Sequence, residues 1–478
     1  MGPRAEPAGS GPRVRAVSRR RKGWGLDTGA RATVRKMNAP RAATTGLRSI
    51  GRALRHRNYR LFFSGQSISL IGTWLTRVAT SWLIYRLTGS ALLLGVLGFA
   101  GQIPTFILAP LAGVLVDRWD RYRVLVVTQV LAMVQSGLLA ALALTGVINV
   151  WHVLVLSVFQ GFINAFDMPA RQSLVVQMVE DRADLPNAIA LNSSMVNAAR
   201  LLGPAAAGVL IAAVGEGWCF FVDALSYLAV IASLLFMRIQ RRPRAVRSTR
   251  VLHEMAEGFR YASGFAPIRA VLLLLAVVSL MGMPYTVLMP VIAREVLLGG
   301  AGTLGALTAS SGLGALIGAL YLASRRTVVG LGRLIVASAM LFGVGLVGLS
   351  RVDALWAALP VMLVTGAGMM LQMASSNTVL QTLVDEDKRG RVMSLFAMAF
   401  FGMAPLGSLL AGALASRMGA QNTILAGGLA TIVAAAVFLR ALPELRRVVR
   451  PIYVRMGILP EIAQGLQAAA LAPQSPEP

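Results

Sequence analysis

The chain alternates between long apolar stretches and short polar linkers. Between residues 60 and 440 there are twelve such stretches, each dominated by Ile, Leu, Val, Ala, Phe and Gly. A helix needs about 20 apolar residues to cross a hydrocarbon core roughly 30 Å thick. The pattern therefore predicts an all-α membrane protein with twelve transmembrane helices, at 60–86, 91–116, 124–146, 151–177, 187–213, 218–238, 268–293, 301–323, 331–350, 354–382, 391–416 and 421–440.

The linkers between these stretches alternate in charge. One set is basic, and it includes the N-terminal tail, the loops after the second and fourth stretches, and the chain beyond Arg440. The other set is short and nearly uncharged, as at 89–90, 215–217 and 419–420. Because Lys and Arg stay on the cytoplasmic side of a membrane, this alternation predicts a multi-pass protein of the cell inner (plasma) membrane with both termini in the cytoplasm.

The linkers also suggest five regions. We expect a disordered basic tail at 1–57, a six-helix bundle at 58–238, a cytoplasmic linker at 239–267, a second six-helix bundle at 268–440 and a cytoplasmic tail at 441–478. Within the linker, apolar residues from Leu252 to Ala262 recur at helical spacing opposite charged ones, which predicts an amphipathic helix on the membrane surface. A tether between the bundles is favoured over a regulatory role. Met37 is a candidate for the true start, and a transit peptide is a weaker alternative.

Composition removes several classes of protein. A hydrophobic fraction of 56% with 14% charged residues is incompatible with an ordinary soluble globule. The net charge of +26 follows the membrane topology and argues against nucleic-acid binding. One cysteine and three separated histidines support neither a disulfide framework nor a metal site. Since neither a phosphate-binding glycine loop nor a catalytic constellation is present, we expect no enzyme activity and no cofactor.

The chain also repeats itself at an offset of 205 residues. Residues 160–161 align with 365–366, and 173–179 with 378–384, each run being followed by an acidic cluster. The same offset places Gly113 on Gly318. Chance similarity between apolar segments is the alternative, and one offset shared by two separate regions favours a duplication over it. The repeat predicts two pseudo-symmetric six-helix bundles, an arrangement suited to alternating access around a midplane site.

Residues 113–123 (GVLVDRWDRYR), between the second and third stretches, resemble the signature G-x-L-x-D-R-x-x-R of the major facilitator superfamily. Residues 165–172 (AFDMPARQ), 200–204 (RLLGP) and 221–226 (FVDALS) are similar to its enterobactin-exporter branch, the transmembrane secretion effector group. The likeness covers residues 55 to 440. It implies the major facilitator fold and an exporter driven by an ion gradient, for which we expect protons.

The resemblance assigns a gating role to Gly113, Asp117, Arg118 and Arg121. It implies that Asp117 faces Gly390 and Arg391 at the start of the eleventh helix, where a helix N-terminus favours an anion. The alternative is that the arginines only follow the topology rule. The chain departs from the family at Ser157, where an arginine linked to proton handling often stands, and at Leu322, where the second half lacks the loop aspartate.

Charged residues within the stretches are candidates for coupling or substrate contact, because each costs around 2.5–3.5 kcal/mol at the bilayer centre. Asp167 and Arg171 are four residues apart and can pair on one helix face, for structure or for function. Arg200 and Asp223 can meet across a tight turn. The candidates are Arg77, Asp167, Arg171, Arg200 and Asp223.

Two further groups complete the candidate site. Gly203, Pro204 and Gly208 resemble a helix-5 motif of antiporters, and the proline bends its helix. The polar cavity candidates, for which interhelical filler is an equal alternative, are Gln102, Gln160, Asn164, Asn197, Gln372 and Asn377.

The leading functional hypothesis is a monomeric efflux carrier for a small organic molecule such as a drug or siderophore. An importer or a lipid flippase on the same fold remains open, as does a non-transporting membrane sensor or assembly protein.

Overall fold

The computed structural model describes residues 2, 51–238, 251–325, 327–386 and 388–456, without the side chains of Pro110, Asp117, residues 251–256 and Arg455. The chain divides into Met1–Ser49 and Ile50–Pro478, and the architecture below is that of the second unit. Our predictions for residues 3–50, 239–250 and 457–478, including disorder and the start at Met37, lie outside the described residues. So does the side chain of Asp117.

The first half of this unit consists of six long helices. Their bounds are α2 (Arg57–Thr88), α3 (Ala91–Arg118), α4 (Arg121–Leu144), α5 (Val150–Met178), α6 (Leu185–Val214) and α7 (Glu216–Leu235). Local signals set several of these ends. Gly89 ends α2 in the left-handed region at φ 60°, and the Ser90 side chain accepts a hydrogen bond from the Leu93 N–H to begin α3. Asn149 and His152 form a reciprocal cap at the start of α5.

The second half has the same order of elements with more interruptions. Its first span is built from α9 (Ala266–Val277), the π-helical turn η3 (Val278–Gly282), α10 (Tyr285–Val291) and the π-helical turn η4 (Ile292–Val296). Next come α11 (Ala301–Ser324), α12 (Leu331–Leu349) and α13 (Leu355–Leu383). The last spans are α14 (Arg389–Ala397) with η5 (Met398–Gly402) and α15 (Met403–Met418), then α16 (Ala420–Arg455). The π-helical turns lie beside Pro284, Pro290 and Pro405, where the missing proline N–H disturbs the helical hydrogen bonds.

Eleven helical segments of the described residues are long and apolar enough to cross a membrane. Helix α2 is the twelfth long segment, with 32 residues, but it is more polar than the others. The reason is that it buries polar side chains, Gln66 at 2% and Ser69 at 1% exposure, against the rest of the bundle. The predicted all-α membrane fold is thus confirmed, with its first span the most polar.

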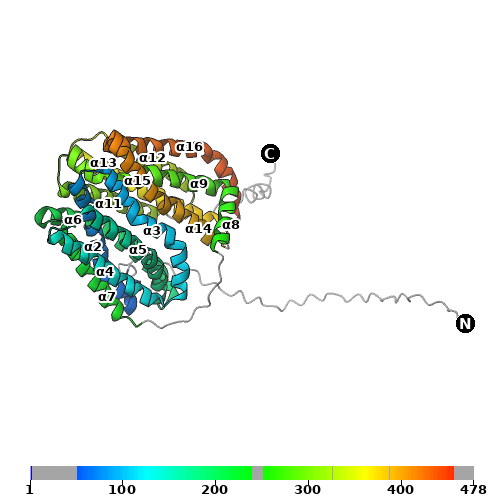
Figure 1. Ribbon diagram of the computed structural model, residues 1–478. Coiled ribbons are helices and arrows are strands. Elements are labelled where there is room, and N and C mark those ends of the chain that lie inside the picture. The colour runs from blue at the N-terminus through cyan, green and yellow to red at the C-terminus, as the bar shows by residue number, and fades with distance from the viewer. Residues whose placement is uncertain (1, 3–50, 239–250, 326, 387, 457–478) are drawn as a thin grey trace, which may run out of the picture. The chain divides into compact units, whose positions relative to one another are not determined.

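The two halves repeat in space as the sequence predicted. Helices α5 and α13 begin and end 205 residues apart, the offset of the sequence repeat. In the first half α7 packs on α2 and α4, and in the second half α16 packs on α9 and α12. The halves meet along two seams, α3 with α15 and α6 with α11, whose helices lie side by side in Figure 1.

The linkers lie at two opposite ends of the helices. We call one end the basic end, because arginines flank its linkers, as Arg118 and Arg121 flank 119–120. The end with the linkers 89–90, 215, 299–300 and 419 is the short-loop end. At the short-loop end the seams close tightly. A Cβ on Gly95 would lie 2.8 Å from the Gly412 Cα, and a Cβ on Gly305 would lie 2.7 Å from the Gly208 Cα. Glycine therefore permits backbone contact between the halves there.

The structure corrects the edges of two predicted regions. Residues at the end of the expected disordered tail 1–57 are ordered, since η1 (Arg52–Arg55) buries Ala53, whose N–H donates to Asn187 Oδ1 at 2.9 Å. Helix α16 continues to Arg455, past the expected boundary at 440. The predicted amphipathic linker helix is present as α8 (Val251–Gly264), next to α14.

Candidate functional site

Two arginines lie deep in the first half, near the meeting of the halves. Arg77 on α2 is exposed and its guanidinium lies 4.8 Å from the ring centroid of Trp74. Arg200 on α6 is half-buried, and its Nη2 lies 3.7 Å from the sulfur of Met369 on α13, across the interface. The two positive charges are close enough to repel each other. The structure thus brings together two of the charges that we predicted separately.

Asp223 on α7 is buried at 1% exposure and is surrounded by hydroxyl groups. Its Oδ2 accepts hydrogen bonds from Thr76 Oγ1 and Ser136 Oγ, both at 2.7 Å. We expected Arg200 to meet Asp223, and the structure corrects this: among the described residues the partners of Asp223 are hydroxyls. The depth of a residue can be estimated from sequence, whereas the direction in which its helix face turns cannot.

Asp167 and Arg171 form the ion pair that their spacing on α5 predicted. Asp167 is buried at 5% exposure and also accepts hydrogen bonds from Thr128 Oγ1 at 3.1 Å and Gln129 Nε2 at 2.6 Å on α4. The carboxylate is therefore neutralised and joins two helices. This environment differs from that of Asp223, which has hydroxyl partners and no cation.

The helix-5 motif packs on two neighbours, α2 of its own half and α11 of the other half. Gly203 on α6 leaves room for the Trp74 side chain of α2, and Gly208 faces Gly305 of α11. Pro204 is buried within α6. Pro204 and Gly208 are therefore packing elements of the interface between the halves, whereas Gly203 fits α6 against α2.

The two halves are also linked by side chains at the short-loop end. The Tyr85 hydroxyl on α2 donates to Glu295 on η4, a contact from one half to the other. Arg86 forms a bidentate ion pair with Glu216, in which Nε donates to Oε1 at 2.8 Å and Nη2 donates to Oε2 at 3.2 Å. Both residues line a cavity of about 550 Å³ bounded by α2, α6, α7 and the start of α11. We did not predict Tyr85 or Glu295, since sequence gave no sign that a tyrosine here would find a carboxylate 210 residues away.

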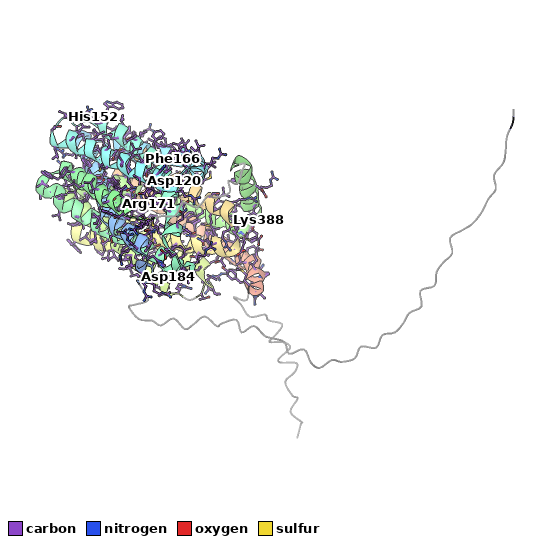
Figure 2. The ribbon with its side chains drawn as sticks, turned by 90° about the horizontal axis from the view of Figure 1, so that it is seen from below. Asp120, His152, Phe166, Arg171, Asp184 and Lys388 are labelled. Atoms are coloured by element: carbon purple, nitrogen blue, oxygen red, sulfur yellow. The ribbon has the colours of Figure 1, made fainter. Side chains whose placement is uncertain are left out.

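At the basic end, the two glycines of the predicted gate face open space. A Cβ on Gly113 of α3 or on Gly390 of α14 would have nothing within 4 Å. Arg118 is exposed, and Trp119 stacks on Phe166 with ring centroids 6.2 Å apart. Asp120 is the N-cap of α4, and Figure 2 shows Asp120 and Phe166 well apart from His152, which lies in the first turn of α5 at the short-loop end.

The predicted partner of Asp117 is engaged elsewhere. Arg391 Nη1 on α14 lies 2.8 Å from Glu257 Oε1 on the linker helix α8. Close by, Lys388 lies 4.6 Å from the ring of Tyr261 on the same helix, and Figure 2 places Lys388 beside α8. Arg121 begins α4 and also has an interaction partner. The gating residues are thus at the basic end, where the halves do not close on Gly113 or Gly390.

Most of the polar cavity candidates bond within their own helices. Gln160 donates to Asn164 at 3.0 Å, Gln102 to the Gly98 carbonyl at 3.0 Å, and Asn197 to the Ser193 carbonyl at 2.9 Å. Asn377 accepts from Gln381 at 2.9 Å. Gln372 is fully buried and packs between helices. We had predicted that it lines a cavity, and in this structure it does not.

An all-helical unit of two repeated bundles that meet along two seams defines the class of membrane transporters with the major facilitator fold. A sequence model described as "Transmembrane secretion effector" matches residues 51–450. The chain belongs to this family of the major facilitator superfamily, whose members are transporters and not enzymes.

Curated relatives match almost their full length. The chain is 26% identical to the staphyloferrin A transporter of Staphylococcus aureus, over 79% of this chain and 95% of the relative. It is 28% identical to the multidrug efflux pump Tap of Mycolicibacterium fortuitum, over 80% of this chain and 95% of the relative. It is 23% identical to macrolide efflux protein A of Streptococcus pyogenes, over 82% of this chain and 98% of the relative.

Solved structures share the fold. A bacterial homologue of the human lysosomal transporter Spinster, in an inward-facing and unoccupied conformation, has a TM-score of 0.63 at 14% identity, covering 83% of this chain and 98% of that chain. The nucleoside transporter NupG has a TM-score of 0.61 at 14% identity, covering 81% of this chain and 99% of that chain.

Proposed function

We propose that this chain is a monomeric secondary active transporter that exports a small organic molecule by alternating access, with its basic end in the cytoplasm of a bacterial cell. The observation that carries the proposal is one-sided closure. The halves touch through glycines and through Tyr85 and Glu295 at the short-loop end, whereas Gly113 and Gly390 face open space at the basic end. This arrangement corresponds to an inward-open state, in which a cargo enters from the cytoplasm.

Export is favoured over import by the relatives, two of which are efflux proteins and one a siderophore transporter. By analogy, the cargo is a drug-like or siderophore-like molecule. The positive-inside distribution of arginines supports the cytoplasmic placement of the basic end. A lipid flippase and a non-transporting sensor remain the competing functions, and the accumulation experiment below separates them from a carrier of soluble compounds.

Proton coupling is part of the proposal, with Asp223 as the carrier of the proton. A buried carboxylate without a cationic partner gains most from protonation, and the hydroxyls of Thr76 and Ser136 can turn to accommodate either form. Asp167 already has Arg171 as its counter-ion and is the less suitable carrier.

The test measures accumulation of a panel of antibiotics and siderophores in cells that lack or overproduce the chain. The proposal expects lower accumulation of at least one compound when the chain is overproduced, and loss of that difference when the proton gradient is collapsed. Equal accumulation of all compounds in both strains contradicts a carrier function. A difference that persists without the proton gradient contradicts proton coupling alone.

A further inference from the structure

The two deep arginines lack counter-ions. Among the described residues, the ion pairs of this chain involve neither Arg77 nor Arg200. The buried carboxylates of the described residues are engaged elsewhere: Asp167 with Arg171, Glu216 with Arg86 and Asp223 with hydroxyls. Two positive charges that repel each other therefore share one region at mid-depth without compensation.

This arrangement is costly for a membrane protein. One arginine at the centre of a span costs about 2.5–3.5 kcal/mol on insertion scales, and a second like charge nearby adds repulsion. Arg77 does not face lipid, because it lies near Arg200, which contacts Met369 of the other half. The exposed side chain of Arg77 therefore lies beside the interface between the two halves.

The surroundings of the two charges are apolar. Trp74 covers Arg77 on one side, Met369 contacts Arg200, and Tyr285 of α10 is near enough to interact with the Arg200 charge. Guanidinium groups bind carboxylates in a bidentate manner, and aromatic and methionine side chains accept apolar bodies of varied shape. The site combines a doubly positive centre with adaptable apolar walls.

We propose that Arg77 and Arg200 together bind the anionic group of the cargo, so that the substrate is an amphipathic organic acid, with a carboxylate next to an apolar body. This inference rests on the proposed carrier function and specifies its substrate class. The cargo supplies the counter-charge that the protein lacks, and its binding relieves the repulsion between the two guanidinium groups.

The test uses three probes that share one apolar body and differ in charge: adamantane-1-carboxylate, adamantane-1-carboxamide and 1-adamantylmethylammonium. The full chain is placed in phosphatidylcholine nanodiscs, and binding is followed by tryptophan fluorescence, since Trp74 lies against Arg77. A Trp74→Phe variant identifies the responding tryptophan.

We expect the carboxylate to bind about tenfold more tightly than the amide, and the ammonium probe not to compete, because a charge-assisted contact is gained only by the anion. Arg77→Gln and Arg200→Gln should each weaken carboxylate binding by about tenfold and leave the amide unchanged. Arg77→Lys should retain part of the preference. The matched control is Arg351→Gln, which removes an exposed charge at the short-loop end and should change nothing.

Equal affinity of the three probes, or no saturable signal from the carboxylate, overturns the inference. So does competition by added phosphatidylglycerol, which would assign the arginines to a lipid headgroup. The accumulation experiment is independent of these outcomes: efflux of a neutral or cationic compound with no carboxylate preference would keep the carrier function and remove the organic-acid assignment.

Discussion

At the scale of single residues, the two buried aspartates of the described residues show how the surroundings of a carboxylate determine its role. Asp167 has a cation, Arg171, and an amide donor, so its charge is balanced within the bundle. Asp223 has hydroxyl donors, which stabilise a carboxylate and tolerate a carboxylic acid. The two aspartates should therefore respond differently to the same substitution.

Asp223→Asn mimics the protonated acid and should leave the folded protein about as stable as the wild type. Transport against a gradient should fall to background, while exchange of substrate down its gradient continues, because the gates still move. Both activities are measured in proteoliposomes with and without an imposed pH difference. Proton-driven accumulation at the wild-type rate in this variant would remove Asp223 from coupling.

Asp167→Asn should instead act on stability, since it leaves Arg171 without its counter-ion. We expect a loss of about 1–3 kcal/mol, the cost of a hydrogen-bonded charge left unsatisfied, measured as a lower thermal unfolding midpoint of the purified protein. Asp167→Glu is the matched control that keeps the charge. An unchanged midpoint in the asparagine variant would show that the Asp167–Arg171 pair contributes nothing to the fold.

The residue scale also shows what sequence can specify. The pair Asp167–Arg171 followed from a spacing of four on one helix, which fixes a common face. The partner of Asp223 and the contact of Tyr85 with Glu295 depend on how separate helices are rotated, which spacing along one helix does not determine. Depth, in contrast, follows from position within a span, and it identified Arg77 and Arg200.

At the scale of elements, the seam between α6 and α11 controls whether the short-loop end can close. Gly305 and Gly302 are on the same helix, three residues apart, yet a Cβ on Gly305 would meet the backbone of α6 while one on Gly302 would meet open space. A Cβ on Gly208 would lie near the Cα atoms of both residues, at 3.0 Å from Gly305 and 3.2 Å from Gly302, but of the two only Gly305 would direct its own Cβ at α6. A substitution at Gly305 therefore has a matched control at Gly302, one helical turn away.

Gly305→Val should hold the short-loop end apart and favour the outward-open arrangement. Overpacking of about 1–3 kcal/mol corresponds to roughly a 5- to 150-fold change in the ratio of the two states. The measurement is the rate of maleimide labelling from the outside at a cysteine placed at Ala207, in a Cys219→Ser background. Labelling should increase in Gly305→Val and stay at the wild-type rate in Gly302→Val; equal rates in all three proteins would contradict the role of the seam.

The gating segment between α3 and α4 yields a further prediction at the level of elements. Arg391 is bound to Glu257 of α8 here, and Gly113 and Gly390 face open space. If Asp117 meets the start of α14 only when the basic end closes, Asp117→Asn should reduce transport with near-normal expression and folding. Transport assays on matched amounts of purified protein test this, and full activity would remove the gate assignment.

At the scale of the whole molecule, twelve spans and a twofold repeat followed from the sequence because bilayer thickness and charge asymmetry are strong constraints. The conformational state did not follow, since two arrangements of one bundle pair differ by only a few kcal/mol. The boundaries at 57 and 440 also differ from the ends of the ordered helices, because Ala53 of η1 bonds to Asn187 and the end of α16 packs on the core through Leu442 and Leu445, contacts that composition does not reveal.

The most direct test of the account measures both ends of the molecule at once. Spin labels at Val147 and Asp353 report the short-loop end, and labels at Asp181 and Glu386 report the basic end, with one label in each half. In proteoliposomes, alternating access predicts two distance populations at each end. Gly305→Val should lengthen the distance between the labels at the short-loop end and shorten the distance between the labels at the basic end. Distances that stay single and unchanged at both ends, in the wild type and in the variant, would contradict the central claim that the halves rock about a shared site.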